Sequence, residues 1–161
     1  MIKFSRKIYL QFLFFLSILT LSSALIIEYI FGYQPCNLCE IERIPYMLSI
    51  IIIITNYYFR RDQIFYSILL MLVFAFSIII SFYHFGIEQG FIKESAFCAA
   101  ENLDLLTKED VLNSFDNLNI SCKNVAFKVF NLSLTTYNIL ISLLMFLVST
   151  KIYLISDDIK K

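Results

Sequence analysis

Four long apolar runs separated by polar segments set the pattern of this chain. They cover residues 8–31, 44–59, 64–85 and 132–155. A helix needs about 20 apolar residues to cross the ~30 Å hydrocarbon core of a bilayer. The second run is short for this, so we expect its helix to begin as early as Leu38, with its first turn in the headgroup region. The pattern predicts an all-α membrane protein, a four-transmembrane-helix bundle that forms a single integral membrane domain over residues 1–161.

A cleavable signal peptide is the alternative interpretation of the first run. Signal peptides carry an apolar region of about 7–15 residues followed by a small-x-small cleavage site. The first run is longer than this, and Ser22-Ser23-Ala24 is followed by further apolar residues. An uncleaved span is therefore favoured. Its one charged residue, Glu28, lies near the end of the run, where its side chain can reach the interface.

Composition agrees with a membrane protein. The chain is 59% hydrophobic and 16% charged, whereas soluble domains are about 45–50% apolar and about 25% charged. The formal net charge is zero, so bulk charge gives no reason to expect a nucleic-acid partner. The length suits one small helical bundle rather than two domains.

The placement of lysine and arginine orients the bundle, because cytoplasmic segments of membrane proteins are enriched in them. With the N-terminus in the cytoplasm, the short inside segments hold eight of these residues, namely Lys3, Arg6, Lys7, Arg60, Arg61, Lys151, Lys160 and Lys161. The outside segments hold five over a much longer stretch, namely Arg43, Lys93, Lys108, Lys123 and Lys128. We therefore expect a bacterial inner-membrane protein with both termini cytoplasmic. A short first loop (32–43) and a long second loop (86–131) then face the periplasm.

Four cysteines lie in these two loops, Cys36 and Cys39 in the first and Cys98 and Cys122 in the second. Disulfides persist in an oxidising periplasm. Four cysteines allow three connectivities, and pairing within each loop is the one expected here. Three interpretations remain: a dithiol–disulfide relay, structural disulfides alone, and a Cys₄ metal site. The relay is favoured by spacing and topology. A metal is disfavoured, because Cys98 and Cys122 do not form a second close pair.

The first cysteine pair lies in a motif that resembles the signature of the DsbB family of bacterial inner-membrane thiol oxidoreductases: Gly32-Tyr33-x-Pro35-Cys36-x-Leu38-Cys39-x-x-x-Arg43-x-Pro45-Tyr46. Two further segments are similar to the family, Tyr83-His84-x-Gly86-x-Glu88-x-Gly90 and Leu132-Ser133-Leu134-x-x-Tyr137-Asn138. The other two cysteines fall where the second pair of the family falls. The resemblance extends over residues 24–145.

This resemblance implies a membrane thiol oxidoreductase that reoxidises a periplasmic DsbA-like thioredoxin-fold oxidase and passes the electrons to a membrane quinone. In the implied route, the partner forms a mixed disulfide with Cys98. Cys122 then attacks Cys36, which leaves Cys39 as a thiolate facing the quinone. Ubiquinone is expected rather than menaquinone, although no residue here separates the two. No metal and no nucleic acid are expected.

Arg43 and His84 are the residues expected to bind the quinone. Arg43 follows Cys39 by four residues, which is the same face if this stretch is helical, and its cation can stabilise a thiolate or polarise a quinone carbonyl. The backbone amides at the start of this helix are expected to point toward the Cys39 thiol. Against this, Arg43 can be an interfacial anchor. His84 is the only histidine. The resemblance makes it a neighbour of the quinone and a proton donor, and an ordinary polar cap is the alternative.

Several other polar residues near the periplasmic side are expected to have structural roles or to modify the charge near the cysteines. Glu28 and Asn138 are expected to form interhelical hydrogen bonds, and Glu88 either pairs with His84 or lies solvated in the loop. Glu40 and Glu42 flank the first cysteine pair with negative charge, which opposes thiolate formation.

Two other kinds of protein share some of these features. A non-catalytic membrane scaffold with structural disulfides remains an alternative. A protein similar to vitamin K epoxide reductase is disfavoured, because its Cys-x-x-Cys follows the loop cysteines, whereas here it precedes them.

Overall fold

The structure is a computed structural model, and it describes residues 2–59, 63–93, 98, 122, 128–129 and 132–160. Most of the predicted second loop and the Arg60-Arg61 pair lie outside these residues. Four long helices dominate the described part of the chain: α1 (Ile2–Tyr29), α3 (Ile44–Tyr58), α4 (Gln63–Glu88) and α6 (Leu134–Lys160). A short helix, α2 (Asn37–Ile41), and a two-stranded antiparallel sheet of β1 (Lys128–Val129) and β2 (Leu132–Ser133) complete it.

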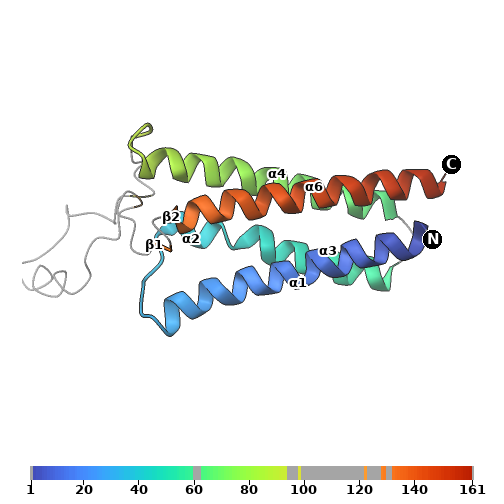
Figure 1. Ribbon diagram of the computed structural model, residues 1–161, viewed down its shortest axis with the longest axis horizontal. Coiled ribbons are helices and arrows are strands. Elements are labelled where there is room, and N and C mark those ends of the chain that lie inside the picture. The colour runs from blue at the N-terminus through green and yellow to red at the C-terminus, as the bar shows by residue number, and fades with distance from the viewer. Residues whose placement is uncertain are drawn as a thin grey trace, which may run out of the picture.

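The four long helices lie alongside one another and form a closed bundle (Figure 1). Helix α4 packs most extensively on α6, and the ring is completed by α1 on α3, α3 on α4, and α1 on α6. Both termini lie at one end of the bundle, and α2 with the small sheet lies at the opposite end (Figure 1). This arrangement brings the segments that precede α2 and α6 together at one rim.

Three of the described helices contain stretches long and apolar enough to cross a membrane, namely Arg6–Tyr29, Gln63–Glu88 and Leu134–Asp157. Helix α3 has 15 residues, so it is about 22 Å long at 1.5 Å per residue. The continuous helix expected from Leu38 onward is wrong, because α2 ends at Ile41 and α3 begins at Ile44. The cause is Pro45, which cannot donate a hydrogen bond to the carbonyl of Ile41 and whose ring clashes with it. Pro45 instead lies in the first turn of α3, where a missing N–H group leaves no intrahelical hydrogen bond unmade.

The helix ends differ from the ends of the apolar runs. Helix α1 starts at Ile2, before the run that begins at residue 8, and α4 continues to Glu88, beyond the run that ends at residue 85. The fourth run was expected to be helical from Leu132, but Leu132 and Ser133 form β2, and α6 begins only at Leu134. Hydropathy indicates which residues suit lipid, but the backbone hydrogen bonds of a helix can continue through polar and charged residues. The helices therefore do not end where the apolar runs end.

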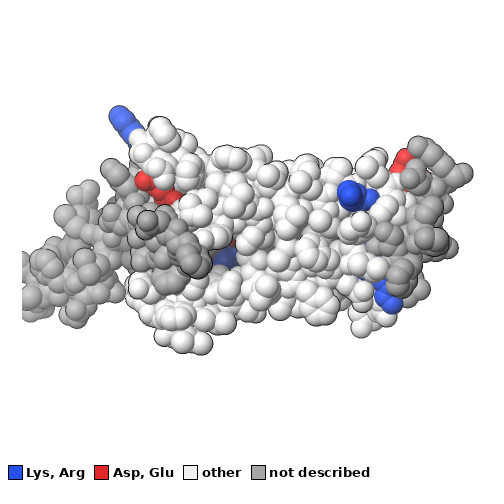
Figure 2. All heavy atoms as spheres, viewed as in Figure 1, with Lys and Arg blue, Asp and Glu red and all other residues white. Residues whose placement is uncertain are grey.

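The surface of the bundle is apolar along its middle, and its charged side chains lie mostly toward the two ends (Figure 2). Large side chains on the outer face are well exposed, among them Phe15 at 67%, Leu72 at 62% and Ile79 at 66%. Exposed apolar surface on this scale is rare on soluble monomers. Inside the bundle, Leu13, Leu70, Phe74, Met145 and Ile152 form a buried core. The outer face is therefore suited to lipid.

Pairs of serines hold neighbouring helices together inside the bundle. We call them the serine pairs: Ser17 with Ser49 at 2.7 Å, Ser77 with Ser142 at 2.8 Å, and Ser67 with Ser156 at 3.4 Å between hydroxyl oxygens. All six side chains are buried. Small side chains allow close approach of helix backbones, and hydroxyls can hydrogen bond across the interface.

Candidate functional site

The first cysteine pair forms a disulfide at the start of α2. The Cα atoms of Cys36 and Cys39 are 5.1 Å apart. Cys36 is the N-cap residue of α2 in an extended conformation, and its sulfur accepts a hydrogen bond from the backbone N–H of Cys39 at 3.2 Å. Cys36 is buried, and Cys39 is partly exposed. The short helix therefore presents one side of the disulfide to the protein interior.

The second pair also forms a disulfide, between Cys98 and Cys122, with Cα atoms 5.4 Å apart. The predicted pairing within each loop is thus confirmed. Both residues are buried, and they belong to one cluster with Cys36, Leu38 and Ile87, against which Cys39 packs. The two disulfides, far apart in sequence, share one buried cluster at the end of the bundle.

His84 lies directly behind the first disulfide. It comes from the last turns of α4, is 2% exposed, and has its Nε2 atom 3.6 Å from the Cys36 sulfur. Its Nδ1 atom is 3.1 Å from Oε1 of Glu42. An ionised carboxylate can only accept hydrogen bonds, so Nδ1 carries the proton that is shared with Glu42. The neutral ring then presents the lone pair of Nε2 to the sulfur.

Glu88 places a second carboxylate beside the same ring. Its Oε1 atom is 3.9 Å from His84 Nε2, and it accepts a hydrogen bond from the hydroxyl of Thr135 at 2.6 Å. The Thr135 hydroxyl also lies 3.4 Å from His84 Nδ1. The Glu88 side chain is 5% exposed, and its Oε2 atom has no hydrogen-bond partner among the described residues. The imidazole is thus enclosed by two carboxylates.

Arg43 lies between α2 and α3 and pairs with Glu28 of α1. Its Nη1 atom donates to Oε2 of Glu28, and the two side chains are 16% and 20% exposed. This ion pair ties α1 to the start of α3. A guanidinium group has five N–H donors, so the Nη1 contact leaves Arg43 further capacity to hydrogen bond.

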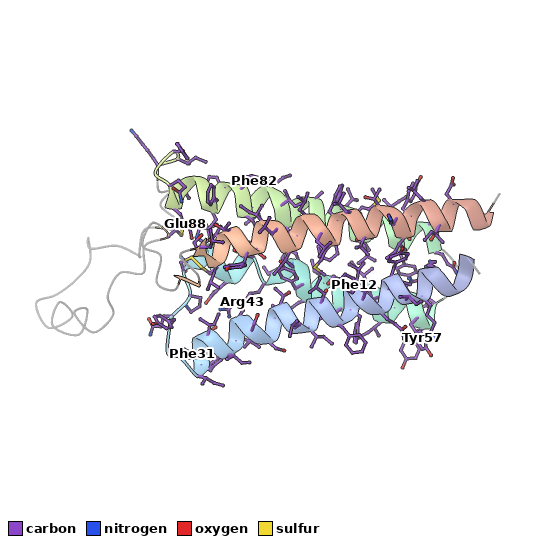
Figure 3. The ribbon with its side chains drawn as sticks, in the orientation of Figure 1. Phe12, Phe31, Arg43, Tyr57, Phe82 and Glu88 are labelled. Atoms are coloured by element: carbon purple, nitrogen blue, oxygen red, sulfur yellow. A yellow bond between two sulfur atoms is a disulfide. The ribbon has the colours of Figure 1, made fainter. Side chains whose placement is uncertain are left out.

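A cavity of about 190 Å³ joins these groups. The redox and charged residues in its wall are Cys36, Cys39, Glu42, Arg43, His84, Glu88 and Cys122. An apolar wall faces them, with Leu21, Ala24 and Ile27 from α1 and Leu134 and Ile141 from α6. Figure 3 shows Arg43 and Glu88 toward the end of the bundle that carries α2, with Tyr57 toward the opposite end. The cavity suits a flat apolar ring that carries hydrogen-bond acceptors.

A protein-family model described as "Disulfide bond formation protein DsbB" matches residues 6–152, which is nearly the whole chain. The chain belongs to this family. Among curated proteins, "Uncharacterized protein RP370" of Rickettsia prowazekii (strain Madrid E) is 41% identical over 85 residues, which is 53% of this chain and 49% of that protein. The chain thus spans about half the length of the curated relative it matches. No solved structure matches it.

The DsbB family consists of membrane proteins of disulfide bond formation. The structure brings together the residues that the resemblance to this family led us to expect. Cys36, Cys39, Cys122, Arg43 and His84 all line the cavity. Cys98 lies in the adjoining buried cluster, bonded to Cys122.

Two details of the expected DsbB-like site are wrong. Arg43 was expected on one helical face with Cys39, but the helix ends at Ile41, and Arg43 precedes the next helix and pairs with Glu28. The amide groups at the helix start were expected to face the Cys39 thiol. Instead, the N–H of Cys39 donates to the sulfur of Cys36, because α2 begins earlier than expected, with Cys36 as its cap.

Sequence reasoning missed the role of Glu42 and Thr135. Glu42 was read as a negative charge that opposes thiolate formation, yet its side chain is bound to His84. The signal for Glu42 was its position three residues after Cys39, one helical turn away. No signal in the sequence pointed to Thr135. The interhelical roles expected for Glu28 and Asn138 are confirmed, because Asn138 donates to Ser81 at 2.7 Å and accepts from Tyr46.

Proposed function

We propose that this DsbB-family protein is a membrane thiol oxidoreductase that reoxidises a periplasmic DsbA-like dithiol oxidase and passes the electrons to a membrane quinone. The observation that carries the proposal is that both disulfides adjoin in one buried cluster, with Cys36, Cys39 and Cys122 in the wall of one cavity beside Arg43 and His84. Thiol–disulfide exchange requires a thiolate to reach a disulfide sulfur, and this cluster keeps the sulfurs within reach of each other.

Electrons pass from the partner to the first cysteine pair by successive thiol–disulfide exchanges. A partner thiolate attacks Cys98, and Cys122 leaves as a thiolate. Cys122 attacks Cys36, which releases the Cys39 thiolate, and the second partner thiol resolves the mixed disulfide and frees Cys98. Cys98 then attacks Cys122, re-forms the second disulfide and frees Cys36. The partner has lost two electrons and two protons, which now reside on Cys36 and Cys39.

Arg43 and His84 are the residues that would hold the quinone head in the cavity, with the apolar residues of α1 and α6 against the ring. The quinone, when bound, would be the two-electron acceptor that restores the Cys36–Cys39 disulfide. We propose ubiquinone rather than menaquinone. Arg43 would donate a hydrogen bond to a carbonyl oxygen of the quinone and would stabilise negative charge there. His84 Nε2, 3.6 Å from the Cys36 sulfur, would accept the proton of the Cys36 thiol and donate it to the reduced quinone. Glu42 keeps the ring in the tautomer needed for this.

For the whole chain, residues 1–161, we propose one integral domain in the bacterial inner membrane with four spans, both termini in the cytoplasm and both cysteine-bearing loops in the periplasm. The location of both termini at one end of the bundle supports an even number of crossings (Figure 1). Three of the described helices are long enough to cross the membrane, and a count of four spans requires that α3 cross it as well. Helix α3 is too short to do so by itself. Helix α2 and the turn before α3 extend this segment into the headgroup region.

The test is dithiol-dependent quinone reduction by the purified protein. Cys36→Ala and Cys39→Ala are expected to abolish turnover while circular dichroism shows an intact bundle. Cys98→Ser is expected to prevent the mixed disulfide with the partner. Thr55→Ala, on the far half of α3, serves as a control with wild-type turnover. Turnover that persists without Cys36 or Cys39 would contradict the relay and favour a scaffold with structural disulfides.

A further inference from the structure

We propose that the reduced form of the first cysteine pair is a metal site, in which the thiolates of Cys36 and Cys39 and Nε2 of His84 bind zinc or a similar thiophilic divalent cation. One ligand atom from each residue lies within 4.8 Å of the others. The sequence alone disfavours a metal, because Cys98 and Cys122 are far apart. The fold supplies the missing donor from elsewhere, since His84 comes from α4 and lies against the pair.

The distance between the Cys36 sulfur and the His84 ring fits tetrahedral zinc. Zinc binds thiolate sulfur at about 2.3 Å and imidazole nitrogen at about 2.0–2.1 Å, so a tetrahedral angle separates these two ligand atoms by ~3.6 Å. The distance from Cys36 sulfur to His84 Nε2 is 3.6 Å. The two sulfurs, bonded in the oxidised protein, must move apart after reduction to ~3.8 Å, the separation of two thiolates on one zinc. A Cys-x-x-Cys segment accommodates that separation in many zinc sites.

The ring of His84 is already oriented for a metal. Histidine ligands usually donate their other N–H group to a carboxylate, which fixes the tautomer and raises the basicity of the ligating nitrogen. Here Nδ1 of His84 is 3.1 Å from Glu42, so the free lone pair of Nε2 faces the sulfurs. Glu42 thus acts as a positioning residue, and it does not bind the metal itself.

The charges around the site also favour a cation. After reduction, two thiolates would lie beside the carboxylates of Glu42 and Glu88, while Arg43 is already paired with Glu28. Oε1 of Glu88 is 3.9 Å from His84 Nε2, and its other oxygen has no hydrogen-bond partner among the described residues. A divalent cation compensates this negative charge, and either Glu88 or water from the cavity can fill the fourth position, as in zinc sites with three protein ligands.

Metal binding requires the pair to be reduced first. A dithiol such as dithiothreitol supplies two electrons and two protons, becomes a disulfide itself, and leaves two thiols at Cys36 and Cys39. The metal then displaces those two protons as it binds the thiolates. The binding does not depend on the proposed function, because a chemical reductant replaces the partner. Only the effect on turnover rests on the proposed function: a bound cation holds the pair reduced and blocks its reoxidation.

The experiment uses cobalt(II) as a spectroscopic probe for the zinc site. The full-length Cys98→Ser/Cys122→Ser variant in detergent micelles is reduced, freed of reductant without oxygen, and titrated with cobalt chloride. We expect one cobalt per chain, with the visible absorption of a tetrahedral site and a thiolate charge-transfer band, and displacement by zinc. The oxidised protein is expected to show neither band. Glu42→Gln should weaken binding about 10–100-fold, His84→Ala should remove the tetrahedral spectrum, and Thr55→Ala should match the parent.

Absence of the charge-transfer band from the reduced protein would overturn the proposal. So would unchanged cobalt affinity in both His84→Ala and Glu42→Gln, provided that circular dichroism shows them folded. Should His84→Ala fail to fold, the affinity of Glu42→Gln decides alone. Quinone reduction in the presence of a chelator, measured on the wild-type protein, tests the proposed function separately. Zinc is expected to stop that turnover and the chelator to restore it.

Discussion

Among single residues, Arg43 and His84 differ in the number of carboxylates that lie beside them in the cavity. His84 lies between two carboxylates, Glu42 at 3.1 Å and Glu88 at 3.9 Å, and it is 2% exposed. Arg43 pairs with the single carboxylate of Glu28. His84 is therefore placed to exchange protons with the Cys36 sulfur, whereas Arg43 is placed to donate hydrogen bonds to a neutral ligand.

Arg43→Gln is expected to raise the KM for quinone about tenfold or more. A hydrogen bond from a charged group contributes about 1.5–3 kcal/mol, and about 1.4 kcal/mol corresponds to a factor of ten. Steady-state quinone reduction with a fixed dithiol concentration measures this. Glu28→Gln is the matched control, because it removes the same ion pair but keeps the cation, and its KM should change less. An unchanged KM in Arg43→Gln would place the quinone elsewhere.

The sequence pointed to the residues that carry motifs, and to Glu88 as a partner of His84, but not to the partners Glu28 and Glu42. Arg43 and His84 follow from their place in the resemblance to the DsbB family. The pairing of Arg43 with Glu28 and of His84 with Glu42 depends on how each helix is rotated about its axis. Apolar runs that face lipid on one side and protein on the other do not fix that rotation. Glu42 was therefore visible in the sequence only as a nearby charge.

Between helices, the serine pairs set how closely the backbones approach. Ser142 is the most connected of them, because its hydroxyl lies 2.8 Å from Ser77 of α4 and 3.1 Å from the Tyr46 hydroxyl of α3. It is fully buried. One small residue of α6 thus connects three of the four long helices, a short distance from the cavity.

Ser142→Ala is expected to lower the free energy of unfolding by about 0.6–1.7 kcal/mol, the range for interhelical hydrogen bonds in membranes. Ser142→Leu should cost about 1–3 kcal/mol more, because it overpacks a close helix contact. Unfolding in detergent, followed by circular dichroism, provides the measurement. Leu140→Ala on the exposed face of α6 is the control and should change stability little. Equal stability of Ser142→Leu and the parent would contradict the close packing.

The existence of the four long helices could be predicted from hydropathy, but their ends could not. Helix α1 includes Lys3 and Arg6, and Arg6 is buried and donates to Asn56 at 3.3 Å. A charged residue that finds a partner inside the bundle does not end a helix. The break between α2 and α3 is the converse case, because a single proline ends α2 within a segment that otherwise favours a helix.

At the scale of the whole molecule, the disulfides and the termini occupy opposite ends of the bundle. Figure 1 shows α2 and the small sheet at one end and both termini at the other. The proposed orientation puts the first end, with Cys98, in the periplasm, the compartment of the proposed soluble partner. The apolar middle in Figure 2 separates the two ends.

This orientation predicts a labelling pattern in intact cells. A cysteine at Lys93, next to the end of α4, should react with a membrane-impermeant maleimide without permeabilisation. A cysteine appended after Lys161 should react only after the membrane is permeabilised. The native cysteines are held in disulfides, so the parent protein serves as the unlabelled control. The reverse pattern would place the cysteine-bearing loops in the cytoplasm and exclude a periplasmic partner.

The serine hydroxyls also bear on how the protein enters the membrane. The hydroxyls of Ser17, Ser67 and Ser156 each lie 2.7–2.8 Å from a carbonyl oxygen four residues earlier in their own helix, those of Leu13, Gln63 and Ile152. Because a hydroxyl has one proton, each can donate either to this carbonyl or to the serine on the neighbouring helix. A single helix that moves from the translocon into the bilayer therefore exposes few unsatisfied hydrogen-bonding groups to lipid. Biogenesis can proceed one helix at a time, and the cross-helix contacts form only when a later segment arrives.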